Sequence, residues 1–119
     1  WVTENIGVTS AEGADEAIRL GLFVINTAGE ISNKANAKLD VSPGNGTVIQ
    51  TLQTGVELMK QIVSCNRQVV VHCSMGMERS VLMVAWYLIR YDGMTFDTAY
   101  ARVRSARPIA TDRRTWITA

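Results

Sequence analysis

The stretch VVVHCSMGMERS, residues 69–80, contains the residues of this chain whose types and spacing best suit chemistry. Cys73 follows an apolar run directly, and Arg79 stands six positions later. The apolar run predicts a buried strand and the residues from Arg79 onward predict a helix, so a short loop joins them. Such a turn leaves backbone N–H groups unpaired and converging, and with the helix N-terminus they form a cradle for an anion. The pattern predicts a phosphate-binding loop with a thiol beneath it.

Each polar residue around this loop has a predicted role. The field that binds phosphate also favours a thiolate, so Cys73 is the predicted nucleophile, which attacks phosphorus and forms a phosphocysteine intermediate. The planar guanidinium of Arg79 binds two phosphate oxygens, and Gly76 permits the backbone conformation of the turn. Ser80 is placed to help the thiolate leave, and His72 is expected to fix the loop and tune the thiol. The predicted phosphate loop comprises Ser74, Met75, Gly76, Met77, Glu78 and Arg79.

The departing alkoxide or phenoxide needs a proton, and a carboxylic acid on a mobile loop is the usual source. Asp40 follows a short predicted strand and precedes a turn cluster at residues 42–46. We therefore expect it at the C-terminal edge of the sheet, where the sites of α/β proteins collect. Asp40 is the predicted general acid, and later the base that activates water. Asp112 is the alternative.

The composition excludes several other classes of protein. Of the 119 residues, 47% are hydrophobic and 19% charged, which is typical of a globular chain, and we expect residues 1–119 to form a single domain. The net charge of +1 indicates neither a nucleic-acid nor a membrane partner, and no apolar run reaches the roughly 20 residues of a membrane span. No metal or cofactor is predicted. We expect a solvated basic face formed by Arg107, Arg113 and Arg114.

The two cysteines point to a reducing compartment. Cys65 and Cys73 lie at opposite ends of the predicted strand, roughly 25 Å apart if the segment is extended, whereas a disulfide needs Cα atoms within about 7 Å. No bridge between them is expected, and a free functional thiol suits the cytosol. The sequence therefore predicts a cytoplasmic protein, and we expect a monomer.

Hydrophobic patterning predicts strands that alternate with helices. Apolar runs and turn signals place strands at residues 6–8, 22–25, 37–41 and 68–72. Helical spacing and capping signals place helices at residues 14–20, 47–65, 79–91, 95–107 and 111–119. The alternation indicates a single layered α/β domain with a mostly parallel central sheet of about four to five strands, flanked by helices.

The loop resembles the His-Cys-x5-Arg-Ser/Thr signature of the cysteine-dependent protein tyrosine phosphatase superfamily, and within it the small dual-specificity group. The matching residues are His72, Cys73, Gly76, Arg79 and Ser80. Asp40 precedes Cys73 by about the interval that this group shows between acid and nucleophile. The resemblance implies the fold of that group and a metal-independent phosphatase for phosphorylated proteins or peptides. With no long insertion to deepen the pocket, we expect phosphoserine and phosphothreonine to be accepted beside phosphotyrosine.

Two features of the loop narrow the expected substrates to singly phosphorylated side chains. Ser74, Met75 and Met77 carry no charge, unlike the basic loop residues of the lipid-phosphate branch. Glu78 departs from the family pattern, and an acid beside the cradle opposes highly charged substrates unless it pairs with a cation or turns outward. The alternatives are a non-catalytic phosphate-binding module, or the same chemistry on RNA 5′-triphosphate, a phosphoinositide or a phosphoglucan.

Overall fold

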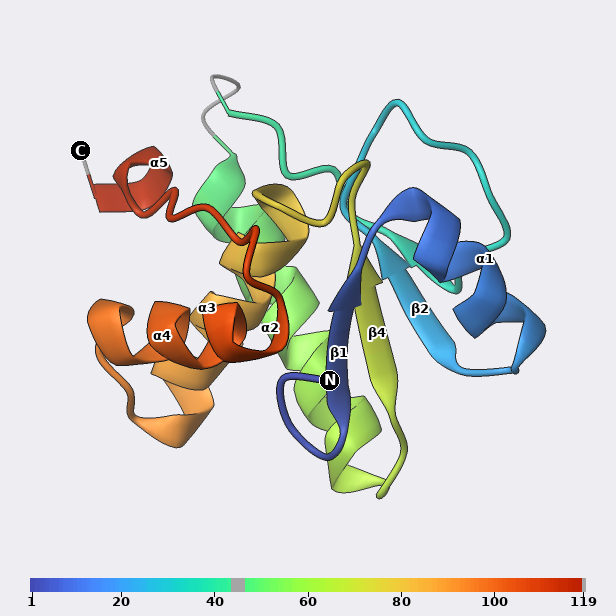
Figure 1. The fold of residues 1–119 in the computed structure, drawn as a ribbon, viewed down its shortest axis with the longest axis horizontal. Helices are drawn as coiled ribbons and strands as arrows, with labels where there is room; N and C mark the ends of the chain where they lie inside the picture. The colour runs from blue at the N-terminus through green and yellow to red at the C-terminus, as the bar shows by residue number, and fades with distance from the viewer. Residues whose placement is uncertain (44–46, 119) are drawn as a thin grey trace.

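The computed structural model describes residues 1–43 and 47–118. Within them the chain forms a four-stranded sheet in the order β1-β4-β2-β3, and each neighbouring pair is parallel. The strands are β1 (Ile6–Thr9), β2 (Phe23–Asn26), β3 (Ala37–Lys38) and β4 (Val69–His72). All of them therefore end at the same edge of the sheet (Figure 1). The predicted parallel α/β architecture is confirmed.

Helices cover both faces of this sheet (Figure 1). They are α1 (Ala11–Arg19), α2 (Val48–Ser64), α3 (Arg79–Asp92), α4 (Phe96–Ala106) and α5 (Thr115–Thr118). The helix α1 lies on one face, and α2, α3 and α4 lie on the other. The helix α3 is apolar on nearly every side because it packs between the sheet and its neighbouring helices.

The central strand β4 is buried along its whole length. Val69 and Val71 face the larger core with α2, α3 and α4, whereas Val70 packs against Ala14 and Ala17 of α1. A parallel strand covered on both faces is expected to be a continuous apolar run, as this one is. The loop that follows β4 is consequently anchored at the centre of the sheet.

Local signals set the helix boundaries. Ser10 caps α1 by accepting a hydrogen bond from the Gly13 amide at 3.2 Å, so this helix begins earlier than predicted. Thr95 caps α4 through the Thr98 amide, also at 3.2 Å, as predicted. The α3 helix ends at Gly93, whose φ of 68° is the left-handed conformation that glycine adopts readily.

The remaining structural predictions have mixed outcomes. The strand predicted at 37–41 is two residues long, and the last helix begins at Thr115 instead of residue 111. Ala119, the predicted end of that helix, lies outside the described residues. Residues 44–46 of the predicted turn cluster lie outside the described residues. Both cysteines are free, as predicted, with Cys65 exposed and Cys73 buried. Among the described helices, none is long and apolar enough to cross a membrane.

Candidate active site

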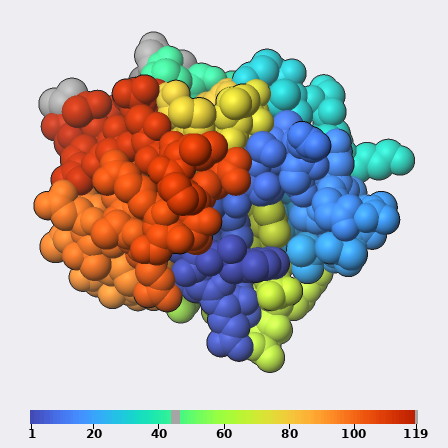
Figure 2. All heavy atoms as spheres, in the orientation of Figure 1, coloured from blue at the N-terminus to red at the C-terminus, as the bar shows by residue number. Residues whose placement is uncertain are grey.

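The loop of residues 73–78 joins β4 to α3 and reaches the surface between two distant parts of the chain. Figure 2 shows it in yellow, with the C-terminal segment in red on one side and α1 in blue on the other. Its position follows from the topology, because β4 is flanked by β1 and β2 and the segments after all three strands meet at one edge. Segments far apart in sequence can therefore contact the loop.

The carbonyl oxygens of residues 73–77 all accept hydrogen bonds from groups around the loop. His72 Nδ1 bonds to the carbonyl of Cys73 at 3.0 Å, and the Ala11 amide donates to the carbonyl of Ser74 at 2.9 Å. Arg107 donates through Nη2 to the next carbonyl, at residue 75, and through Nε to the one at residue 76, both at 2.8 Å. The Thr111 amide donates to the carbonyl of residue 77 at 2.8 Å. In a planar trans peptide the N–H points opposite to the C=O. The amides of residues 74–78 are therefore turned inward, toward the space above the thiol, as in an anion-binding cradle.

Arg107 is thus part of the support of the loop. The prediction of a solvated basic face is wrong for all three arginines. Arg107 is half-buried against the loop, Arg113 pairs with Glu78, and Arg114 pairs with Asp112. Each guanidinium finds at least one acceptor because the chain folds back past the loop after α4.

Gly76 provides the backbone conformation that the sequence predicts for it. Its φ is +70°, in the left-handed region. A Cβ atom at this position would lie 2.7 Å from Arg107 Nε and 2.7 Å from the carbonyl oxygen of Thr9. Only glycine therefore allows both the turn and the close approach of its supports.

Cys73 lies at the base of the loop, and its residue is only 3% exposed. Its Sγ is 3.2 Å from the hydroxyl of Ser80, which is itself fully buried. Burial raises the pKa of the thiol, but hydrogen bonds from the Ser80 hydroxyl and from the amides of Ser80, Glu78 and Gly76 outweigh it, so the net pKa is lowered. The start of α3 adds its dipole at this point. The surroundings favour a thiolate.

His72 holds the loop from below, in a neutral form. Its Nδ1 lies 3.0 Å from the Cys73 carbonyl, which only accepts, so Nδ1 carries the proton. Its Nε2 then accepts from the side-chain amide of Asn33 at 3.1 Å. Burial lowers the pKa of His72, although the bond to Cys73 and the charge of Asp15 act in the opposite direction. Asn33 is a residue that sequence reasoning missed.

Glu30, which the sequence analysis also missed, orients Arg79. The Glu30 carboxylate accepts from Nη1 and Nη2 of Arg79, both at 2.6 Å. This pair lowers the pKa of Glu30 to about 2 and raises that of Arg79. A guanidinium has five N–H donors in a planar fork, so the Nε edge of Arg79 remains available to a phosphate. Strand order indicates this contact. Asn26 at the end of β2 pairs in register with His72 of β4, so the segment after β2, which contains Glu30, lies beside the loop after β4.

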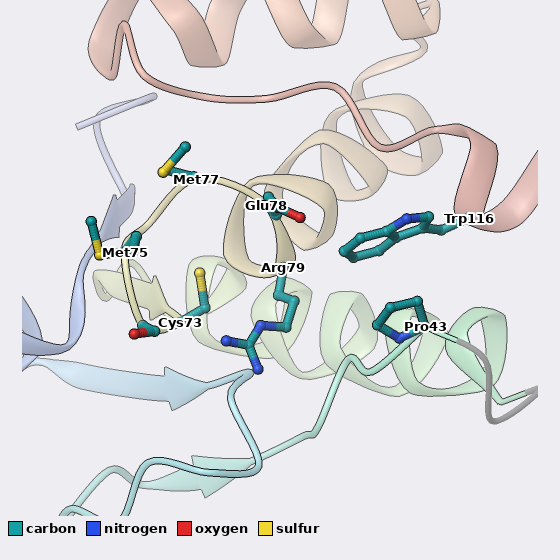
Figure 3. Close-up of a pocket in the computed structure, with 8 residues that line it drawn as sticks. Pro43, Cys73, Met75, Met77, Glu78, Arg79 and Trp116 are labelled. Atoms are coloured by element: carbon teal, nitrogen blue, oxygen red, sulfur yellow. The ribbon is translucent and has the colours of Figure 1, made fainter.

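A pocket of about 310 Å³ opens above Cys73. Figure 3 shows its lining, which comprises Pro43, Cys73, Ser74, Met75, Met77, Glu78, Arg79 and Trp116. Glu78 accepts from Arg113 Nε at 3.1 Å, so its charge is paired with a cation. The pocket therefore combines an anion cradle at its base with an apolar rim. Trp116 is part of this rim, which the sequence analysis did not predict.

Asp40 lies just beyond β3 at the predicted edge of the sheet, and it is exposed. Its carboxylate accepts from the Ser42 hydroxyl at 2.5 Å and from the Gly29 amide at 3.1 Å. Its charge also contributes to the raised pKa of Arg79, although Asp40 is not among the residues that line the pocket. Its position suits an acid on a loop beside the site, and its role stays a prediction.

Asp112, the alternative acid, forms an ion pair with Arg114. Its carboxylate accepts from Arg114 Nε at 2.9 Å and Nη2 at 2.6 Å. Burial raises the pKa of Asp112, but the bonds to Arg114 outweigh burial and the net pKa is lowered. A carboxylate held ionised in this way is a poor proton donor at neutral pH.

The described residues include no group of three or more His, Cys, Asp or Glu side chains that could hold a metal ion. The pocket itself presents a thiol with a lowered pKa, a hydroxyl, an arginine and inward-facing amides. Together with the parallel sheet, these define a cysteine-based phosphate site on an α/β domain.

Comparison with known proteins identifies the family. The family described as "Dual specificity phosphatase, catalytic domain" matches residues 17–118. The chain is 35% identical over 63 residues to Dual specificity protein phosphatase 12 of Mus musculus, covering 53% of this chain and 19% of that protein. It is also 35% identical over 60 residues to Phosphatidylglycerophosphate phosphatase PTPMT1 of Arabidopsis thaliana, covering 50% of this chain and 18% of that protein. The chain thus spans about a fifth of the length of these two curated relatives.

Solved structures agree in fold. The crystal structure of human DUSP28 superposes with a TM-score of 0.81 at 24% identity, covering 98% of this chain and 85% of that chain. The chain belongs to the dual specificity phosphatase catalytic domain family. The resemblance to the small dual-specificity group is therefore confirmed.

The loop's dependence on Gly76 is testable through stability. We expect Gly76→Ala to lower the free energy of unfolding by about 2–4 kcal/mol, because it adds a steric clash to the strain of a positive φ. Gly93→Ala is the matched control: its φ is +68° and nothing lies within 4 Å of the added Cβ, so it carries the strain alone, about 1 kcal/mol. Urea denaturation of both variants measures the difference, and equal losses would contradict the role of close packing at Gly76.

The Ser80 hydroxyl is predicted to depress the thiol pKa. Ser80→Ala removes a hydrogen bond to the thiolate, so the pKa of Cys73 should rise and the reactive thiolate should appear at higher pH. The pH dependence of iodoacetamide alkylation measures this directly, with Cys65→Ser as the background so that one thiol reports. An upward shift of the profile is expected, and an unchanged or downward-shifted profile would show that the amides alone set the thiol pKa.

Proposed function

We propose that this domain is a phosphoprotein phosphatase that hydrolyses phosphotyrosine, and also phosphoserine and phosphothreonine, through a phosphocysteine intermediate. The observation that carries the proposal is the buried Cys73 thiol, whose pKa is lowered beneath the inward-facing amides of its loop. Membership of the dual specificity phosphatase family supports it. A non-catalytic binding module is disfavoured, because it would need the cradle but not an activated thiol.

The reaction follows from the positions of these groups. The Cys73 thiolate attacks phosphorus as the bond to the leaving oxygen breaks, and the loop amides with Arg79 stabilise the three equatorial oxygens. Asp40 protonates the departing oxygen. Water, deprotonated by Asp40, then attacks the phosphocysteine and releases inorganic phosphate, while Ser80 donates a hydrogen bond to the sulfur as it leaves.

A lipid phosphate is the second candidate substrate, because one relative bears the name of a phosphatidylglycerophosphate phosphatase. The loop gives less support to this candidate than to a phosphoprotein. Ser74, Met75 and Met77 are uncharged. Arg113 is already paired with the carboxylate of Glu78. A parallel assay on phosphopeptides, phosphatidylglycerophosphate, inositol phosphates, RNA 5′-triphosphate and phosphoglucan separates all the substrate classes.

The setting of the enzyme is also part of the proposal. The free thiols of Cys65 and Cys73 suit a reducing compartment such as the cytosol. We propose that residues 1–119 act as one phosphatase domain and as a monomer; the family match over residues 17–118 supports the first part.

Replacement of the nucleophile tests the proposed chemistry. Cys73→Ser should lower kcat on p-nitrophenyl phosphate by a factor of at least about 10³, since a serine hydroxyl is not ionised at neutral pH. Cys65→Ser removes the other, exposed cysteine and should retain full activity. Rapid quenching of wild-type turnover with ³²P-labelled substrate should trap label on Cys73. Near-normal turnover by Cys73→Ser would disprove the mechanism.

The predicted acid is tested by leaving-group dependence. Asp40→Asn should lower kcat/KM on phenyl phosphate by about 10²–10³ and affect p-nitrophenyl phosphate much less, because p-nitrophenoxide leaves without protonation. A general acid acts in its protonated form, so the basic limb of the pH–rate profile should vanish in the variant. Asp92→Asn, on the exposed end of α3, is the matched control. If Asp112→Asn instead removed the basic limb, Asp112 would be the acid.

A further inference from the structure

The apolar side of the pocket is formed by a residue from the other end of the chain. Trp116 of α5 lines the cavity together with Pro43, and Figure 3 shows both rings on the same side of it, with Arg79 between them and Cys73. A phosphate bound above Cys73 therefore has an indole and a pyrrolidine ring beside the path of its ester group. This wall is reached only by a group that extends outward from the phosphate.

The indole is held in place by an ion pair to the phosphate loop itself. The Arg113 guanidinium lies 5.9 Å from the Trp116 ring centroid, and its Nε donates to Glu78 at 3.1 Å. The Trp116 amide donates to the Arg113 carbonyl at 3.0 Å, and the indole packs against the main core. The Arg113 amide is in turn fixed by the hydroxyl of the buried Tyr100 at 3.2 Å. Glu78, Arg113 and Trp116 thus form one connected unit, so the wall has a defined distance from the cradle.

The chemistry of the ester group determines what this wall can bind. An aryl phosphate carries a flat, rigid ring that extends from the phosphate and presents a π face to an indole. The side chains of phosphoserine and phosphothreonine have one or two carbons beyond the ester oxygen and no such face. Aromatic pairs gain stability beyond their buried area when they pack offset or edge to face.

We propose that Trp116, positioned by Arg113 and Glu78, makes this site select aryl phosphate side chains over alkyl phosphate side chains. The proposal rests on the phosphatase function proposed above and specifies the substrate class of the same pocket. Glu78 then acts as the anchor of a specificity element, which accounts for an acid beside an anion site.

The experiment compares two peptides that differ only in phosphotyrosine or phosphothreonine at one position. Trp116→Ala should lower kcat/KM on the phosphotyrosine peptide by roughly three- to tenfold, mainly through KM, and change the phosphothreonine peptide by less than about twofold. Trp116→Phe keeps an aromatic face and should retain the wild-type selectivity. Trp1→Ala is the matched control, because Trp1 is 56% exposed and lines a different groove.

Two further comparisons make the outcome decisive. Trp116→Leu keeps apolar bulk in α5 without an aromatic face, so it should keep phosphothreonine turnover while losing the phosphotyrosine preference. If Trp116→Leu and Trp116→Ala lowered both peptides equally, or neither, the assignment of Trp116 would be overturned while the phosphatase function stood. If wild-type protein hydrolysed neither peptide, the proposed function itself would be wrong.

Discussion

The hydrogen bonds to the carbonyl oxygens of residues 73–77 are the constraint on which the rest of the site depends. A loop of this length adopts many conformations, and only those with every carbonyl turned outward direct the amides at one point. The donors come from β4, from the start of α1 and from the segment after α4. Each carbonyl therefore has its own donor atom, and the loop cannot invert one peptide without losing a hydrogen bond of about 1 kcal/mol. The cradle is fixed before any anion arrives.

The same constraint explains why the pKa of the buried thiol is lowered. Burial alone favours the neutral thiol, because taking an ion out of water is costly. The amides of Gly76, Glu78 and Ser80 and the Ser80 hydroxyl supply the compensating hydrogen bonds, and they are already oriented toward Sγ. Groups that stabilise the thiolate are also those that face a phosphate. In the proposed mechanism, one geometry thus serves both the nucleophile and the stabilisation of the transferred group.

The sequence contained enough information to predict the loop and its frame. Buried strands appear as apolar runs and α3 as an apolar helix, and the spacing of Cys73 and Arg79 depends only on local geometry. Glu30 and Asn33 were missed because their contacts with Arg79 and His72 depend on strand order, which places the segment after β2 beside the loop after β4. No local periodicity encodes strand order.

The three arginines near the C-terminus were mispredicted for a related reason. An arginine in a polar stretch looks solvated unless its acceptor is known, and here the acceptors lie across the fold. Arg107 bonds to carbonyls 31 and 32 positions away in sequence, and Arg113 reaches an acid 35 positions away. Even Arg114, whose main partner Asp112 is local, reaches across to Asp97 on α4. Thr95, by contrast, caps a helix through its near neighbours and was predicted correctly.

The two carboxylates beside the cradle are both stabilised by an ion pair with an arginine. A carboxylate near an anion site is unfavourable by Coulomb's law, and the cost falls when each carboxylate is neutralised by its own cation. Glu30 pairs with Arg79, and Glu78 pairs with Arg113. Each acid thereby fixes an arginine that otherwise has several free rotamers. The fork of Arg79 is oriented in advance for a phosphate, while Arg113 is held against the indole of Trp116. Since both of these positive charges are already matched, neither arginine is left unpaired for a second phosphate group, which is consistent with the proposal of singly phosphorylated side chains as substrates.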